Sequence, residues 1–176
     1  MRHLALQVAA ISAACLVSGT AMAGDPPLVS LGLGGTDILN QQARTAGDFR
    51  LEYRSGISLI PAFEEYVKVK PFAGLELTSR SSGWAGAGIV LDIPLGQHWV
   101  LSPSFAPGVY ARGRGKNLGS FIEFRSQFEG GYVFDNQVRL VASIGHTSNA
   151  GLTKRNPGTE AGIVSLQIPL STVFSR

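Results

Sequence analysis

The sequence predicts an all-β fold, an eight-stranded antiparallel transmembrane β-barrel that follows a cleaved signal peptide. Apolar and polar residues alternate along most of the chain, and Gly and Pro are scattered through it, which is typical of strands and turns. The mean hydropathy is slightly positive, at +0.16. After the first residues, however, no apolar run is long enough for a membrane-spanning helix. Apolar content without long apolar runs indicates the alternating strands of a membrane barrel.

The first 23 residues have the pattern of a secretory signal peptide. A basic start at Arg2 precedes an apolar stretch over residues 4–17, and Ala21-Met22-Ala23 resembles a cleavage site for signal peptidase. A transmembrane anchor is disfavoured because the apolar stretch is short and ends in small residues. We therefore expect residues 1–23 to be removed and residues 24–176 to form the barrel domain.

Composition excludes several classes of function. The only cysteine, Cys15, lies in the predicted signal peptide, so the remaining chain cannot be held together by disulfides. That remainder carries 14 Lys and Arg against 12 Asp and Glu, without a basic cluster interleaved with aromatics, so no nucleic-acid partner is expected. The three histidines are far apart in sequence, so no metal site or other cofactor is predicted.

Eight alternating segments supply the strands of the barrel. They lie at residues 28–39, 48–60, 67–80, 83–95, 99–112, 119–134, 138–148 and 160–170. An even number with a minimum of eight is typical of bacterial outer-membrane barrels, and each segment can cross a bilayer on a tilt.

The connections and the aromatic residues also fit a barrel in the outer membrane. Tight turns are expected at residues 94–98 and 134–137, and longer polar loops at 113–117 and 149–159 on the opposite, extracellular side. Residues 61–66 could form a short helix or an irregular turn. Five aromatics near strand ends are expected at the membrane interfaces: Trp84, Trp99, Tyr110, Tyr132 and Phe134.

Strand parity places three polar residues on the outer wall of the barrel. The even-numbered residues of 138–148 form an apolar, lipid-facing row that His146 and Ser148 continue. The even-numbered residues of 160–170 form a second such row that begins at Glu160. Because these strands are neighbours, the three side chains should converge at the extracellular end of the lipid-facing surface. Ionisable groups in such positions are usually functional.

The three residue types suit nucleophilic catalysis. A serine hydroxyl needs a general base, histidine can serve as that base, and a carboxylate can orient the imidazole. Two positions along a flat strand separate side chains by about 7 Å, which is too far for a hydrogen bond. We therefore expect a bulge or bend at Thr147 to Asn149 that brings Ser148 toward His146.

The same region resembles a known family signature. The segments are His146-Thr147-Ser148-Asn149-Ala150-Gly151-Leu152 and Asn156-Pro157-Gly158-Thr159-Glu160. They are similar to the His-x-Ser-Asn-Ala-Gly and Asn-x-Gly-x-Glu elements of the lipid A 3-O-deacylases of the PagL family. The likeness is strongest over about 25 residues and extends loosely to the whole chain through the signal peptide and the strand pattern.

This resemblance implies an outer-membrane serine esterase. The expected reaction is hydrolysis of the ester-linked 3-hydroxyacyl chain at position 3 of lipid A, in the outer leaflet, with release of a 3-hydroxy fatty acid. By the resemblance, Ser148 is the nucleophile, His146 the base and Glu160 the orienting acid. The Gly151 backbone N–H and the Asn156 side chain would form the oxyanion hole, supported by Asn149. Lipopolysaccharide is the expected partner, and two copies could pair as a homodimer through their lipid-facing surfaces.

Three other interpretations remain open at this point. A lipid A acyltransferase would also be an eight-stranded barrel with a serine and a histidine, but it would carry an amphipathic N-terminal helix, for which residues 24–30 leave no room. A non-enzymatic barrel for adhesion or anchoring would not need Asn156 and Glu160. A soluble secreted β-barrel is disfavoured by the asymmetry between turns and loops.

Overall fold

The computed structural model describes residues 25–39 and 45–174 of the chain. The predicted signal peptide, residues 1–23, lies outside this part and stays a prediction. The elements are β1 (Leu28–Thr36), β2 (Ala46–Arg54), η1 (Pro61–Phe63), β3 (Lys68–Thr78), β4 (Gly83–Leu95), β5 (Trp99–Leu101), β6 (Ser104–Ala111), β7 (Ile122–Val133), β8 (Arg139–Ser148), β9 (Thr159–Pro169) and α1 (Leu170–Phe174). None of the helices in the described ranges has the length and apolar character needed to cross a membrane.

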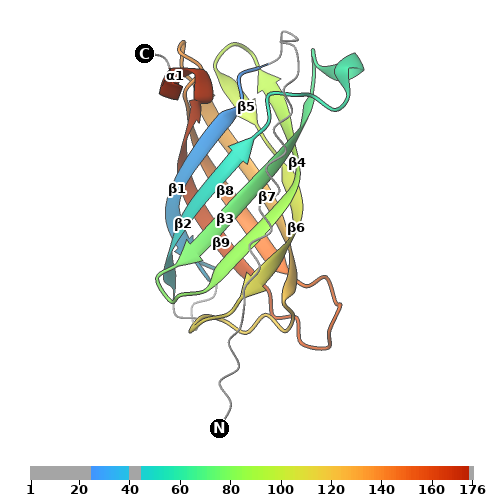
Figure 1. Cartoon of the computed structure of the whole chain (residues 1–176), viewed down its shortest axis with the longest axis vertical. Helices are drawn as coiled ribbons and strands as arrows, with labels where there is room; N and C mark the ends of the chain where they lie inside the picture. Colours follow the sequence, from blue (N-terminus) through green and yellow to red (C-terminus); the bar gives the residue numbers. More distant parts are fainter. Residues whose placement is uncertain (1–24, 40–44, 175–176) are drawn as a thin grey trace, which may run out of the picture.

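The strands form one antiparallel sheet that closes on itself, as Figure 1 shows. Strands that follow each other in sequence are paired, with β5 and β6 both lying between β4 and β7, and β1 pairs with β9 from Leu28↔Pro169 to Thr36↔Ala161. Closure leaves no unpaired sheet edge, so the backbone groups of the strands are hydrogen-bonded within the barrel. The predicted eight-stranded antiparallel barrel is confirmed.

The predicted strand at residues 99–112 is interrupted in the middle, which is why nine strands are labelled. β5 and β6 pair with β4 in the same register, Leu101 opposite Ile93 and Ser104 opposite Val90, so together they make one barrel strand. Pro103 lies in the gap between them and has no N–H to donate to a neighbouring strand. The backbone stays attached there, because Leu91 N–H donates to the Pro103 carbonyl at 2.9 Å.

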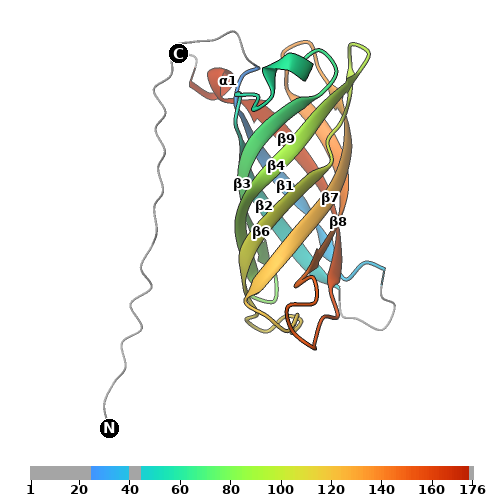
Figure 2. The same ribbon diagram turned by 90° about the vertical axis from the view of Figure 1, so that its right-hand side faces the viewer.

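The two ends of the barrel differ in their connections. One end, here called the turn end, holds the start of β1, α1, the tight turns at residues 96–98 and 134–138, and the longer β2–β3 segment that contains η1 (Figure 1). The other, here called the loop end, holds the β6–β7 loop (residues 112–121) and the β8–β9 loop (residues 149–158), which lie side by side in Figure 2. Of the two possibilities for residues 61–66, the structure has the short helix, a 3₁₀ helix at Pro61–Phe63.

Alternation along the strands separates an apolar exterior from a charged interior, as parity predicts. The exterior carries large exposed apolar side chains, among them Leu33, Phe49, Leu75, Phe105, Phe128, Ile144 and Val164. A soluble protein rarely exposes so much apolar surface, whereas the outer face of a membrane barrel does. The soluble-barrel interpretation is therefore excluded by the pattern of exposure.

The interior is filled by paired charges rather than by a conventional apolar core. The Arg54 guanidinium binds both carboxylate oxygens of Glu129, at 2.8 and 2.9 Å, and Gln167 Nε2 donates to the same carboxylate at 2.8 Å. Asp92 accepts from Arg139 at 2.9 Å and from Lys70 at 3.1 Å. These buried charges are all paired. Since Arg54 lies on β2 and Glu129 on β7, the pairs join strands on opposite sides of the barrel.

A small apolar cluster fills the interior nearer the loop end. It consists of Phe72, Trp84, Val90 and Ala106, with Tyr110 packed against it. The Trp84 indole donates to the Glu123 carbonyl at 3.2 Å, and the Arg125 guanidinium lies 4.2 Å from the Trp84 ring centroid. The predicted interfacial position is therefore wrong for Trp84 and Tyr110, because both face inward. At the turn end, Tyr132 contacts Trp99 and Phe134 edge to face, in agreement with an aromatic belt there.

Replacing Glu129 with alanine tests how much the interior network contributes to the stability of the barrel. Glu129→Ala removes the bidentate partner of Arg54, which keeps Glu52 at 3.0 Å, and also leaves Gln167 Nε2 without an acceptor, so we expect the free energy of unfolding to fall by about 2–4 kcal/mol. Urea unfolding of the barrel in lipid vesicles, followed by electrophoretic mobility of the unheated protein, measures the change. Glu65→Ala, an exposed carboxylate at the turn end, serves as the control and should change the value by less than about 0.5 kcal/mol. A Glu129→Ala protein as stable as this control would contradict the interpretation.

Candidate active site

His146 and Glu160 face each other on the outer wall at the loop end. β8 and β9 pair without interruption from Arg139↔Gln167 to Thr147↔Thr159, which places His146 directly opposite Glu160. His146 Nδ1 lies 3.2 Å from Glu160 Oε1, and the two side chains are 50% and 28% exposed. With Nδ1–H donating to the carboxylate, Nε2 is left as the acceptor that a general base requires.

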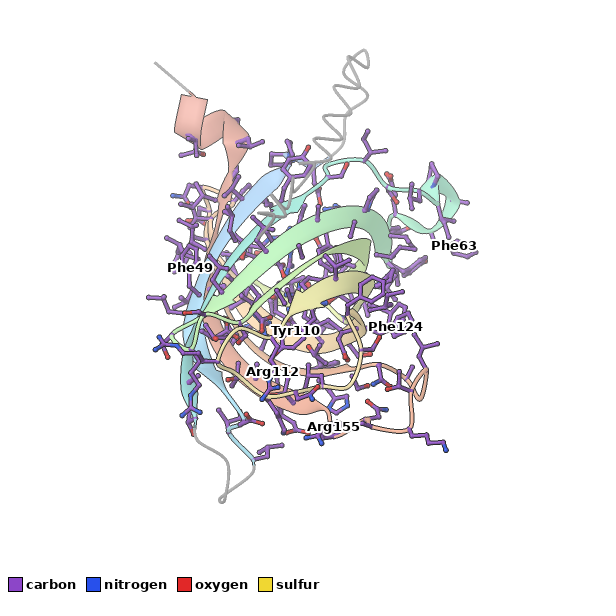
Figure 3. The ribbon with its side chains drawn as sticks, turned by 60° about the horizontal axis from the view of Figure 1, so that its bottom comes forward. Phe49, Phe63, Tyr110, Arg112, Phe124 and Arg155 are labelled. Carbon is purple, nitrogen blue, oxygen red and sulfur yellow. The ribbon has the colours of Figure 1, made fainter. Side chains whose placement is uncertain are left out.

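Ser148 stands on the same outer face, at the last position of β8. It is half-buried and lies opposite Phe124 of β7, a residue labelled in Figure 3. Its hydroxyl makes no hydrogen bond to the residues that the structure describes. Catalytic hydrogen bonds are often formed only when substrate binds, so a free hydroxyl is compatible with a nucleophile.

The predicted bulge beside Ser148 is absent. The pairing of β7 with β8 keeps a single register from Val133↔Arg139 to Phe124↔Ser148. The chain changes direction only after the strand, through left-handed backbone at Ala150 (φ 52°) and Gly151 (φ 81°). A turn that follows Ser148 therefore takes the place of a bulge at Thr147 to Asn149.

Gly158 packs against the imidazole of His146. A β-carbon built on Gly158 would come 2.5 Å from His146 Cε1 and 3.0 Å from Nε2, closer than real side chains approach. The backbone there is also left-handed, with φ 59°, which glycine adopts without strain. Glycine at this position lets the start of β9 lie directly beside the edge of the ring that carries Nε2.

Asn149 organises the loop that follows Ser148. Its side chain is fully buried, and its Nδ2 donates to the carbonyls of Leu118 and Arg155 at 2.9 and 2.8 Å and to Thr153 Oγ1 at 3.1 Å. Its Oδ1 accepts from Gly151 N–H at 3.0 Å, as in an Asx turn. One amide group thus joins the β8–β9 loop to the β6–β7 loop.

The two predicted oxyanion donors are not equally available. Asn149 N–H donates to Asn156 Oδ1 at 3.0 Å, which fixes the orientation of the Asn156 amide. Asn156 Nδ2 has no partner within the described part of the chain and is exposed. Gly151 N–H, in contrast, is already bonded to Asn149 Oδ1. The free donor of the pair is therefore the Asn156 amide.

Asp37 ties a third loop to the start of β9. Its N–H donates to the Glu160 carbonyl at 2.6 Å, and its Oδ1 accepts from Lys116 Nζ at 2.6 Å and from Thr159 Oγ1 at 3.2 Å. Asp37 is 8% exposed and has a left-handed backbone, with φ 55°. This contact holds the backbone of Glu160 from the inner side while its carboxylate faces His146 on the outer side.

The sequence-predicted residues thus form two hydrogen-bonded groups, with Ser148 between them in the chain. His146 and Glu160 are in contact, and Asn149 is bonded to both Gly151 and Asn156. Sequence reasoning missed Gly158 and Asp37. The glycine of the Asn-x-Gly-x-Glu element could have signalled Gly158, whereas nothing in the sequence relates Asp37 to residues more than 120 positions away.

Comparison with solved structures supports the barrel fold. A structure described as the crystal structure of the outer membrane enzyme PagL superposes with a TM-score of 0.64 and 21% sequence identity, covering 81% of this chain and 99% of that chain. A de novo designed transmembrane β-barrel matches with a TM-score of 0.55 and 10% identity, covering 85% of this chain and 98% of the design. At these identities the likeness shows the fold. A search of curated protein sequences finds no match.

A family match covers the part of the barrel that contains the site. Residues 84–169, from β4 to the end of β9, match the model of the family described as lipid A 3-O-deacylase (PagL). The resemblance inferred from the two short segments and the predicted outer-membrane location are confirmed. Through residues 84–169, the chain is therefore similar to the lipid A 3-O-deacylase (PagL) family.

Proposed function

We propose that this protein hydrolyses the 3-O-linked acyl ester of lipid A through Ser148, His146 and Glu160. The observation that carries the proposal is the hydrogen-bonded His146–Glu160 pair on the lipid-facing wall, inside the segment that matches the family. An ionisable pair in this position is costly for a protein with a purely structural role. The loop end would face the outside of the cell, so that the pair lies level with the lipid headgroups.

The reaction would proceed through an acyl-enzyme. Ser148 Oγ attacks the ester carbonyl carbon while His146 Nε2 takes the hydroxyl proton, and Glu160 stabilises the imidazolium through Nδ1–H. Collapse of the tetrahedral intermediate breaks the bond to the sugar oxygen, which leaves with the proton from His146. Water then attacks the acyl-enzyme by the reverse path, giving a 3-hydroxy fatty acid and free Ser148.

Asn156 would stabilise the negative charge that develops on the carbonyl oxygen. Its Nδ2 is unengaged and its orientation is fixed through Oδ1, so it is a preorganised donor of the kind that lowers such barriers. Gly151 N–H can contribute only as a shared donor, because it already binds Asn149. Asn149 would act by holding both donors in place.

The outer wall below the pair offers room for an acyl chain. Small outward residues form a diagonal row there. Gly130 lies opposite Ala142, and the pair of Gly162 and Gly35 is offset from them by two residues and partly covered by the Ile38 side chain. Larger apolar residues border this row on both sides, with Ile144 and Phe128 toward the loop end and Val164 and Leu140 toward the turn end. A chain lying along the row would have its ester near Ser148.

Loss of one 3-hydroxyacyl group from lipid A is the primary test. We expect the purified barrel in detergent to produce that mass shift, and Ser148→Ala and His146→Ala to abolish it, because nucleophile and base act as a unit. Mass spectrometry of the lipid measures the product, and heat-dependent gel mobility shows whether each variant is folded. Intact lipid A with a folded protein, or an acyl chain gained by an acceptor lipid, would contradict the proposal.

Gly158→Ala tests the positioning of His146. The added methyl group would displace the imidazole, and small misplacements of a catalytic group can cost about 100-fold in rate. We expect kcat to fall by about that factor with KM for lipid A little changed. Gly96→Ala is the matched control, because Gly96 also has a left-handed backbone (φ 69°) but a β-carbon there meets nothing within 4 Å. Equal rates in the two variants would contradict a role of the Gly158 contact in positioning His146.

Ala142→Leu tests the path of the acyl chain. A larger side chain in the small-residue row should lower kcat/KM for lipid A by on the order of 10-fold, since apolar pockets discriminate by such factors. Hydrolysis of a short ester such as p-nitrophenyl acetate should be unchanged. Ala87→Leu, also exposed on the outer face but on β4, is the control. A similar loss on both substrates would argue against a chain-binding role.

A further inference from the structure

The two ends of the barrel carry opposite charge. The described loops and turn of the loop end contain six cations and a single acid, Asp37; the cations are Arg80, Arg112, Arg114, Lys116, Lys154 and Arg155. Lys116 is paired with Asp37, and the other five make no ion pair with the residues that the structure describes. At the turn end the charged residues outside the strands are acidic, namely Asp25, Glu64, Glu65 and Asp135 among the described residues, with Lys68 at the first position of β3. The loop end is therefore suited to an anionic ligand.

Arg112 and Arg155 differ from the other cations in how they are held. Arg112 Nε donates to the Gly115 carbonyl at 3.3 Å, and Arg155 Nε donates to the Asn117 carbonyl at 3.2 Å. Both side chains thus rest on carbonyls of the same β6–β7 loop, only two residues apart, and Figure 3 shows them together at the loop end. Their terminal nitrogens have no partner in the described part of the protein. Two guanidinium groups are fixed in orientation but left free to bind.

Arg155 is also attached to the residues of the candidate active site. Its carbonyl accepts from Asn149 Nδ2 at 2.8 Å, and it precedes Asn156 in the chain. A β-carbon on Gly119 would come within 1.8 Å of the same carbonyl, so the β6–β7 loop packs closely on this point. The backbone of Arg155 is consequently held beside Asn149 and Asn156, at the end of the loop that follows Ser148.

We propose that Arg112 and Arg155 together bind a phosphate group on the headgroup of the lipid substrate. The inference deepens the proposed function and rests on it. Guanidinium groups bind phosphate oxygens through paired hydrogen bonds, and a planar group held at Nε presents its remaining donors in a fixed fork. With the acyl chain on the outer wall and its ester at Ser148, the headgroup lies at the level of these loops. Binding its phosphate there aligns the ester with the nucleophile.

Arg80 and Arg114 provide a charge-matched comparison in the same region. Both line a cavity of about 290 Å³ at the mouth of the barrel, on the inner side of the wall, together with Asp37 and Glu76. The proposed catalytic residues project from the outer side. Neutralising this second pair removes the same charge from the loop end without touching the proposed phosphate contact.

Steady-state kinetics on two substrates test the proposal. Lipid A with its phosphates and the same lipid after enzymatic dephosphorylation are compared in mixed micelles. We expect the Arg112→Gln/Arg155→Gln protein to raise KM for the phosphorylated lipid roughly 10-fold, the combined effect of two exposed charge contacts, with kcat within about two-fold. KM for the dephosphorylated lipid should not change. Arg112→Lys/Arg155→Lys should recover part of the loss, because charge is kept while the fork is lost.

Three results would overturn the proposal. An equal KM increase on both substrates would show that the arginines do not act through the phosphate. An equal increase in the Arg80→Gln/Arg114→Gln control would indicate a general attraction between the loop end and anions. Inorganic phosphate could bind with a Kd well below 1 mM without competing with the lipid, which would indicate a site for the free ion.

A binding measurement separates this proposal from the deacylase function. Ser148→Ala proteins with and without the two arginine substitutions are sedimented with micelles of phosphorylated or dephosphorylated lipid A. Weaker binding of the arginine variant to the phosphorylated lipid alone is expected even if no hydrolysis is ever observed. Equal binding of both proteins would refute the phosphate contact while leaving the hydrolysis reaction in place.

Discussion

The pairing of β1 with β9 closes the sheet, and this closure decides where every side chain of the strands points. In a closed barrel each residue faces either the interior or the surrounding lipid, with a period of two along the strand. The register of one hairpin then places His146 and Glu160 together on the outer wall. A shift of one residue in either strand would turn the group on that strand into the interior and separate it from its partner, so the site depends on the same register that separates lipid from charge.

The charged interior makes this register strongly specified. Arg54, Glu129 and Gln167 come from three different strands, and the observed alignment brings their side chains into one hydrogen-bonded group. Buried charges without partners are very unfavourable, so alternative alignments are disfavoured by the interior as well as by the lipid. In this protein, paired charges hold the interior together as apolar packing does in a soluble domain, because the large apolar residues face the lipid.

Much of this architecture could be predicted from the sequence, because strand parity and turn residues are local signals. The barrel, its strand number and the outward direction of His146 follow from alternation alone. The break at Pro103 shifts a strand boundary but not the topology. Trp84 was misplaced because an aromatic near a strand end can face either way, and only the Arg125 guanidinium and the apolar cluster around it decide the direction.

The finer geometry of the site could not be predicted because it depends on contacts between loops. The sequence suggested a bulge at Thr147 to Asn149, but the buried Asn149 amide instead draws the chain into a turn directly after Ser148. Engagement of Gly151 N–H by Asn149 and the contact of Gly158 with the imidazole are equally invisible in a strand pattern. Asp37 reaches Glu160 only because the barrel closes.

All three proposed catalytic residues lie between positions 146 and 160, within one hairpin and its loop, and Asn149 is bonded both within that loop and to Leu118 of the loop before β7. The chemistry is therefore concentrated in the last strands of the chain, whereas β2 and β3 complete the cylinder and balance the interior charge. Such a division allows the two parts to diverge at different speeds. The early strands need to preserve only alternation, closure and charge pairing, so a recognisable family pattern can begin as late as residue 84 in a chain whose whole barrel is shared.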